Sequence, residues 1–279
     1  MLTATLVPLL LLQVGPNPDP NAIGNMIPRD PREESMLPRR LVRSVSETAK
    51  CELGAGIDAA EVAEIASARA QLVSGNERIA ALQCAAMAKA DQGLWDEAAS
   101  GFLEARNAAG GNLLWQARIG TQRAHALVEA GRVIDARSAF EIAIRDALSG
   151  GDTVTAGQIA ADQAIAEVAA GDLEAAGQTL AEARSQSPGE YRVWLLSATL
   201  ARREGDLATA QGHIEKAAEL DGIDPEIGLE AGVIAALDGR LDAARASFES
   251  VAAQPHAGET GNKARAYLAQ LDSMLAENE

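Results

Sequence analysis

The apolar positions of this chain predict a series of paired helices. From about residue 79 onward, alanine, leucine and isoleucine recur at spacings of three and four residues, so they fall on one face of an α-helix. A short motif of the form Gly-x-x-x-x-Ala interrupts this pattern five times. Its alanines are Ala98, Ala136, Ala176, Ala210 and Ala244. Because glycine often ends a helix, we expect each motif to form the turn between two helices.

The five motifs repeat in register. Each motif alanine is followed four residues later by a large apolar side chain and seven residues later by a small one. The large residues are Phe102, Phe140, Leu180, Ile214 and Phe248, and the small ones are Ala105, Ala143, Ala183, Ala217 and Val251. Successive motif alanines are 38, 40, 34 and 34 residues apart. Such a period is typical of solenoids built from helix-turn-helix repeats, so the sequence predicts an all-α fold.

The helical pattern occupies only part of the chain. We expect a solenoid over residues 44–276. Within it the expected parts are an irregular first pair at 44–77, five clearer pairs at 79–258 and a capping helix at 259–276. Residues 1–15 form an apolar, signal-like segment, and residues 16–43 are rich in proline. The proline-rich composition predicts a disordered linker without a core of its own.

The apolar segment bears on the location of the protein. The run from residue 2 to residue 14 is too short to cross a bilayer, so we expect no transmembrane span, and its length suits a signal peptide. No lysine or arginine precedes the run, and no Ala-x-Ala cleavage site follows it. We expect a periplasmic or otherwise exported protein. The alternatives are a mis-assigned start codon or a tether that is not cleaved, and a cytoplasmic location.

Composition and charge narrow the fold and the partners. The chain is 47% hydrophobic but only 3% aromatic, which indicates a core made by close approach of alanine-rich helices. The net charge of the chain is −16. Residues 1–50 have a net charge of +1, so the rest of the chain has a net charge of −17. A body this acidic repels phosphate backbones and anionic lipid. We therefore expect no nucleic-acid partner.

The residues around the turns resemble the tetratricopeptide repeat (TPR), a helix-turn-helix unit of about 34 residues. The unit at 191–224 matches through Trp194, Ser197, Ala198, Ala201, Gly205, Ala210, Ile214 and Ala217. The unit from Ile79 matches through Leu82, Ala85, Ala86, Gly93, Trp95, Ala98, Phe102 and Ala105. The resemblance is strong over residues 79–258 and weak over residues 44–78. It implies a bacterial TPR-like protein folded as a right-handed α-α superhelical solenoid.

The resemblance also implies a concave groove lined by the first helix of each pair. The residues at its groove-facing positions are Gln83, Met87, Arg118, Gln122, His125, Arg192, Thr199 and Arg202. The arginines would make the groove locally basic, and the alternative is that they are solvated helix charges. His125 is a candidate contact, and the alternative is an ordinary half-buried imidazole.

The sequence shows no constellation of residues for catalysis, for a cofactor or for a metal. His125, His213 and His256 lie on different units, and none has the glutamate or histidine spacing of a helical metal site. The phosphate-binding loop, the serine nucleophile elbow and the zinc-protease motif are also absent from the sequence. The sequence therefore predicts a protein that is not an enzyme and needs no cofactor.

The chain has two cysteines, Cys51 and Cys84, separated by close to one repeat length. This spacing predicts that they lie on the first helices of adjacent units, so a disulfide is feasible. Export favours the bond, because an even number of cysteines usually pairs in an oxidising compartment. The alternative is two small buried thiols in a reducing cytoplasm.

These observations lead to two hypotheses about function. The first is a protein-interaction module in the bacterial cell envelope that presents a concave helical groove to a peptide or protein. The second is a structural or assembly subunit that joins a larger envelope complex through its ends or its convex face.

Overall fold

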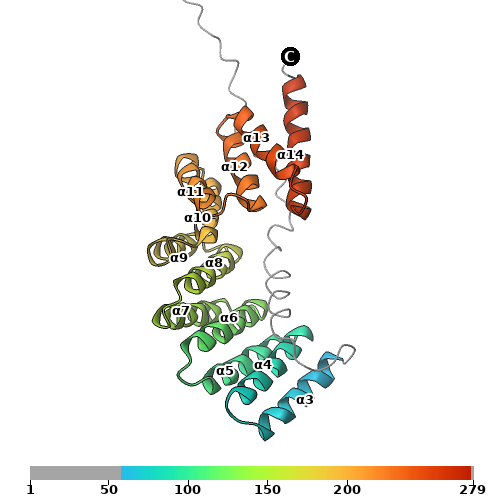
Figure 1. The fold of residues 1–279 in the computed structure, drawn as a ribbon, viewed down its shortest axis with the longest axis vertical. Coiled ribbons are helices and arrows are strands. Elements are labelled where there is room, and N and C mark those ends of the chain that lie inside the picture. Colours follow the sequence, from blue (N-terminus) through green and yellow to red (C-terminus); the bar gives the residue numbers. More distant parts are fainter. Residues whose placement is uncertain (1–57, 278–279) are drawn as a thin grey trace, which may run out of the picture.

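The computed structural model describes residues 58–277, with side chains up to Ser273. This part of the chain contains twelve α-helices and no β-strand (Figure 1). The predicted signal-like segment, the linker, the first helix of the irregular pair and Cys51 lie outside the described residues. The search for membrane spans, which covered the described residues, found no helix long and apolar enough to cross a bilayer.

The helices follow one another with short connections. They are α3 (Ala59–Leu72), α4 (Gly75–Asp91), α5 (Trp95–Ala108), α6 (Leu113–Glu129), α7 (Val133–Ser149), α8 (Thr153–Ala169), α9 (Leu173–Gln186), α10 (Tyr191–Arg203), α11 (Leu207–Leu220), α12 (Pro225–Leu237), α13 (Leu241–Ala252) and α14 (Gly258–Glu277). The first helices of the five predicted pairs are α4, α6, α8, α10 and α12. Their second helices are α5, α7, α9, α11 and α13.

The turn inside each pair is built as the motif predicts. Gly205 ends α10 with φ of +84°, a left-handed conformation that costs a glycine little. The next residue, Asp206, begins α11, and its carboxylate accepts a hydrogen bond of 3.0 Å from the backbone N–H of Thr209. Hydrogen bonds from Thr209, first from its hydroxyl and then from its backbone, lower the pKa of Asp206. One short motif thus ends a helix, reverses the chain and caps the next helix.

The core consists of alanines wedged by one large side chain per pair. The five motif alanines are at most 2% exposed. In the 191–224 unit, Ala198 and Ala210 are fully buried and Ile214 is 1% exposed. Buried apolar residues form successive clusters along the stack, each shared by neighbouring helices, instead of one central core. The predicted all-α solenoid of stacked helix-turn-helix repeats is therefore confirmed.

Some helices approach more closely than alanine would permit. A Cβ atom added to Gly232 on α12 would lie 2.4 Å from the ring of Phe248 on α13. The missing side chain lets the ring rest directly on the helix backbone. Close helix packing in this chain thus depends on glycine as well as alanine.

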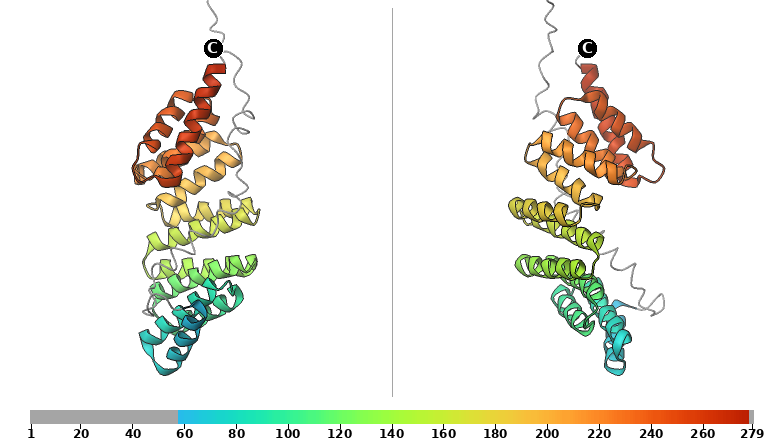
Figure 2. Two further views of the ribbon diagram at one scale, coloured as in Figure 1. Left: turned by 90° about the vertical axis from the view of Figure 1, so that its right-hand side faces the viewer. Right: turned by 60° about the vertical axis from the view of Figure 1, so that its left-hand side comes forward.

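The stack is elongated and bowed. Figure 2 shows successive helix pairs layered along one axis. In Figure 1 the middle of the stack, at α7 and α9, lies to the left of both ends, and α4, α6 and α8 lie to the right of their partners. Over this part of the stack, α4, α6 and α8 therefore line the inner side of the bow, and α5, α7 and α9 line its outer side.

Trp194 on α10 fills the space between the second helices α9 and α11. Its indole N–H donates to the carbonyl of Pro188 at 2.9 Å. The guanidinium of Arg184 on α9 lies 5.9 Å from the centre of the indole, and the ring of His213 on α11 lies 5.6 Å from it. The indole thus packs between a cation and an imidazole.

We expect His213 to make the stability of the protein sensitive to acid. Burial lowers the pKa of His213, repulsion from Arg184 lowers it further, and Asp206 opposes the shift. Below the ordinary value of 6.5 the unfolded chain takes up a proton at this imidazole that the folded chain resists. His213 therefore adds stability above that pH, and this contribution is lost as the pH falls through the lowered pKa.

The expected result is that His213→Gln reduces the loss of stability between about pH 7.5 and about pH 5.5. Urea unfolding followed by circular dichroism at the two pH values measures that loss. The same substitution at His256, which is exposed, is the control and should leave the loss as in the parent protein. An equal loss in His213→Gln and in the parent would contradict the assignment.

Candidate functional site

The inner side of the bow is the candidate functional surface. We call the solvent-facing side of α4, α6, α8, α10 and α12 the inner surface. All eight residues predicted to line a groove lie on three of these helices. Gln83 and Met87 lie on α4, Arg118, Gln122 and His125 on α6, and Arg192, Thr199 and Arg202 on α10.

Two of the eight residues are less accessible than their repeat position predicts. Met87 is 5% exposed and belongs to the apolar cluster shared by α3 to α8. Gln122 is 6% exposed, and its side-chain oxygen accepts a hydrogen bond of 2.7 Å from the amide of Gln83. The bond joins α4 to α6 across two helix pairs. Met87 and Gln122 therefore stabilise the stack. Gln83, the hydrogen-bond partner of Gln122, is half exposed.

His125 lies in an ionic cluster that joins three first helices. Its Nε2 atom is 3.4 Å from a carboxylate oxygen of Asp162 on α8. The other oxygen of Asp162 accepts a hydrogen bond of 3.2 Å from Arg192 on α10. The side chain of Asp162 is 10% exposed and that of His125 is 12% exposed. The cluster thus links α6, α8 and α10 through one largely buried carboxylate.

Two further groups surround the imidazole of His125. The ring meets Phe140 on α7 edge to face, with 5.3 Å between the ring centres. Burial raises the pKa of Glu129, one turn further along α6, and the charge of His125 opposes that shift. The imidazole therefore meets the core at Phe140 and lies beside the carboxylate of Asp162.

The remaining predicted residues differ in exposure. Arg202 donates two hydrogen bonds, of 2.6 and 3.3 Å, to the carboxylate of Glu230 on α12. The hydroxyl of Thr199 donates to the backbone carbonyl of Leu195 at 3.1 Å. Arg118 is exposed on α6. Because acids neutralise Arg192 and Arg202, these two arginines do not make the inner surface basic.

The acidic partners were not predicted from the sequence, although a signal for them exists. Gln122, Asp162 and Glu230 each lie nine residues before the turn glycine of their pair. In each case the side chain at this repeat position accepts a hydrogen bond from a residue on an adjacent first helix. Gln122 was predicted for the groove, and aligning the pairs by their turn glycines would have found Asp162 and Glu230 at the same repeat position.

The described side chains offer no site for a metal. No group of three or more histidine, cysteine, aspartate or glutamate residues within the described part of the chain could hold an ion. Cys84 is buried on α4, and Cys51 lies outside the described residues, so the disulfide between them stays a prediction.

Comparison with known proteins agrees with the repeat geometry. No family model matches the sequence, and no curated protein matches it. The structure is similar to that of BtubC (BKLC) from P. vanneervenii, with a TM-score of 0.51 and 17% identity over 82% of this chain and 91% of that one. Together with the 34-residue steps and the glycine turns, this similarity decides the fold. The chain has a TPR-like fold.

Two other solved structures give lower TM-scores. A tetratricopeptide repeat protein from Parabacteroides merdae ATCC 43184 has a TM-score of 0.36 and 16% identity, over 83% of this chain and 99% of that one. The TPR2AB domain of yeast Sti1, solved in complex with pHSP90, has a TM-score of 0.38 and 13% identity, over 89% of this chain and 97% of that one. The TPR-like fold of the present chain rests on its own repeat geometry.

Proposed function

We propose that this TPR-like protein is a non-enzymatic interaction module whose inner surface binds a segment of a protein partner. The observation that carries the proposal is the continuous polar character of this surface. Side chains from α4 to α12 meet there in pairs that span neighbouring helices, from Gln83 and Gln122 to Arg202 and Glu230. Pairing between helices holds the surface in one shape, and a preformed surface lowers the entropic cost of binding.

The chemistry of the surface favours a polar partner with backbone and side-chain hydrogen-bonding groups. Arg192 and Arg202 are paired with acids, so a purely acidic peptide gains little from them. Arg118 is the exposed cation of the predicted set. We infer that it supplies the main charge contact, with Gln83 and Thr199 as half-exposed polar contacts.

A location in the cell envelope is also part of this proposal. It rests on the apolar run at residues 2–14, which lies outside the described residues, and on the feasible pair of cysteines. Assembly through the ends or the outer side of the stack is the alternative use of the same fold.

Position-specific photocrosslinking tests the proposal on the full chain. We expect a photoreactive residue at Arg118 on the inner surface to capture a discrete partner from native envelope extract. The same probe at Glu215, exposed on the outer helix α11, should not capture it. Arg118→Glu should weaken capture by a probe at Thr199, and Lys216→Glu on α11 is the matched charge reversal that should not.

The outcomes separate the two functions. Equal crosslinking from the inner and outer positions would contradict the proposed surface. Self-association in light scattering, without capture at the inner positions, would support the assembly role instead.

A further inference from the structure

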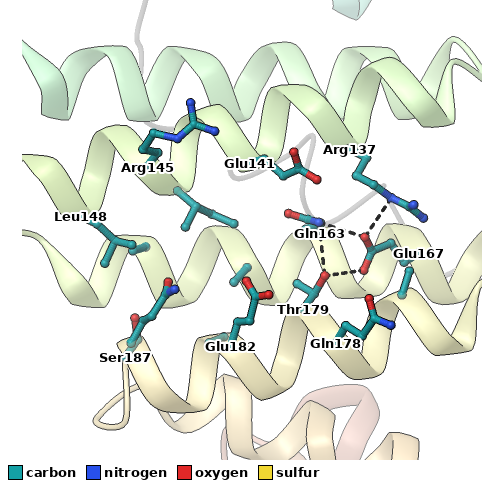
Figure 3. A pocket seen from close by; sticks show the side chains of 16 residues that line it. Arg137, Glu141, Arg145, Leu148, Gln163, Glu167, Gln178, Thr179, Glu182 and Ser187 are labelled. Carbon is teal, nitrogen blue, oxygen red and sulfur yellow. Dashed lines mark hydrogen bonds and ion pairs between the residues drawn. The ribbon is translucent and has the colours of Figure 1, made fainter.

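A cleft opens on the outer side of the stack, away from the inner surface. It lies between the second helices α7 and α9, with α8 as its floor, and has a volume of about 450 Å³ (Figure 3). Apolar side chains form part of its walls. They are Ile144 and Leu148 on α7, Ala156 and Ala160 on α8, and Ala175 and Ala183 on α9.

The cleft exists because one position of the repeat holds a small residue. Ala160 lies eleven residues before its turn glycine, as Trp194 does in the next pair. The indole of Trp194 packs between Arg184 and His213, and the residues at the same repeat positions around Ala160 are Ile144 and Thr179. Both of these line the cleft. The space that an aromatic ring fills between α9 and α11 is therefore open between α7 and α9.

The preceding pair closes the same space in another way. Gly120 occupies the equivalent position on α6, and the guanidinium of Arg106 lies directly over it, 3.6 Å from where a Cβ atom would be. Arg106 in turn pairs with Asp146 on α7. At the two neighbouring interfaces, then, a planar side chain with N–H donors fills the space that the cleft leaves open.

The polar end of the cleft contains an unsatisfied acceptor. Gln163 is 4% exposed, and its side-chain amide N–H₂ donates to Glu167 at 2.9 Å and to Thr179 at 3.2 Å. The hydroxyl of Thr179 donates to the other oxygen of Glu167 at 2.8 Å. Because an ionised carboxylate only accepts, the nitrogen of Gln163 must face Glu167 and its oxygen must face away. That oxygen is buried and has no hydrogen-bond partner.

The charges around this acceptor favour a cation. Glu141 on α7 and Glu182 on α9 are exposed residues of the cleft wall, on opposite sides of it. Arg137 is already held by Asp172 at 2.6 Å and by Glu167 at 3.2 Å. Arg145 lines the rim, and Figure 3 shows its guanidinium directed upward, away from the helices that carry Gln163 and Glu182. Apart from the amide of Gln178, the available groups at the polar end are thus acceptors and carboxylates.

We propose that this cleft binds the guanidinium group of an arginine side chain presented by a partner protein. The apolar walls accept the methylene stem, as they would for any amphipathic side chain. The planar head donates to the free oxygen of Gln163 and to the carboxylates of Glu141 and Glu182. The site lies on the opposite side of the stack from the inner surface, so it does not depend on the function proposed above.

Titration of the ¹⁵N-labelled full chain with small peptides tests the proposal. The probe is acetyl-Gly-Arg-Gly-amide, and the matched control is the same peptide with citrulline, which has the same planar shape without the charge. We expect saturable shifts confined to α7, α8 and α9 with the arginine peptide only. A third titration uses free arginine amide. If the natural ligand is a small molecule, free arginine amide should bind more tightly than the peptide; if it is a side chain of a partner protein, it should not.

Two variants make the test specific. The double variant Glu141→Gln with Glu182→Gln changes only exposed positions and should weaken binding at least about tenfold, or about 1.4 kcal/mol. Glu174→Gln with Glu249→Gln removes two exposed carboxylates elsewhere and should leave binding unchanged. Ala160→Trp introduces at position 160 the residue type that Trp194 provides in the next pair, and it should abolish binding by filling the cleft.

The proposal is overturned if the arginine peptide causes no saturable shifts in a folded parent protein. It is equally overturned if citrulline binds as well as arginine, or if the Glu141 and Glu182 double variant binds like the parent. A cleft that holds only water would give the first of these results.

Discussion

Phe140→Ala is expected to lower the free energy of unfolding by about 3–5 kcal/mol, the range for deleting a fully buried aromatic ring. Phe140 lies on α7, is fully buried, and belongs to a cluster of apolar residues drawn from α3 to α8. Its ring also meets the imidazole of His125 edge to face. Removing the ring leaves a cavity between pairs that have no central core to compensate, because each pair contacts only its neighbours. Urea unfolding followed by circular dichroism measures the loss.

The same substitution should also divide the unfolding transition. In a one-dimensional array, weakening a middle interface uncouples the segments on either side. Hydrogen exchange should then show α8 to α14 more protected than α3 to α7.

Phe248→Ala on α13 deletes a similarly buried ring near the end of the stack, and it should affect only the last helices. Ile134→Ala, at a side chain 84% exposed on α7, should change stability by less than about 0.5 kcal/mol. A single unchanged transition in Phe140→Ala would contradict this account.

The helical architecture was predictable because it is encoded locally. The Gly205 and Asp206 pair specifies a left-handed helix end and a helix start within two residues, and this requires no knowledge of distant parts. The buried alanines follow from the same register, since the motif fixes which face of each helix meets its partner. Local signals of this kind repeat, so each copy supports the others.

The surfaces were less predictable because they depend on how one pair sits on the next. Asp162 meets His125 and Arg192 across two interfaces, and sequence spacing alone does not reveal such contacts. Met87 was expected at the inner surface, yet it is buried in a cluster composed mostly of alanines. The outer cleft depends on a single small residue, Ala160, whose effect appears only beside its counterpart Trp194. Repeat positions therefore predicted the helices well and their exposed contacts poorly.

Asp146→Ala is expected to lower the free energy of unfolding by about 2–4 kcal/mol. This value lies between the loss of one charged hydrogen bond and the breaking of a fully buried ion pair. The side chains of Arg106 and Asp146 are 19% and 14% exposed, and they join α5 to α7. Removing the aspartate leaves the guanidinium over Gly120 without its carboxylate, and its Nε atom already lacks a hydrogen-bond partner. Urea unfolding measures the cost.

A second ion pair on the same helix is the control for this effect. Asp135 and Arg132 are 50% and 46% exposed, so Asp135→Ala should cost less than about 1 kcal/mol. The double variant Arg106→Met with Asp146→Leu removes both charges while keeping apolar volume between α5 and α7. It should recover most of the stability that Asp146→Ala loses, because the cost comes from stranding a desolvated cation and not from losing the attraction itself. A double variant as unstable as Asp146→Ala would contradict this explanation. It would show that the hydrogen bond between Arg106 and Asp146 stabilises the protein by itself, and that filling the space above Gly120 with apolar atoms does not replace it.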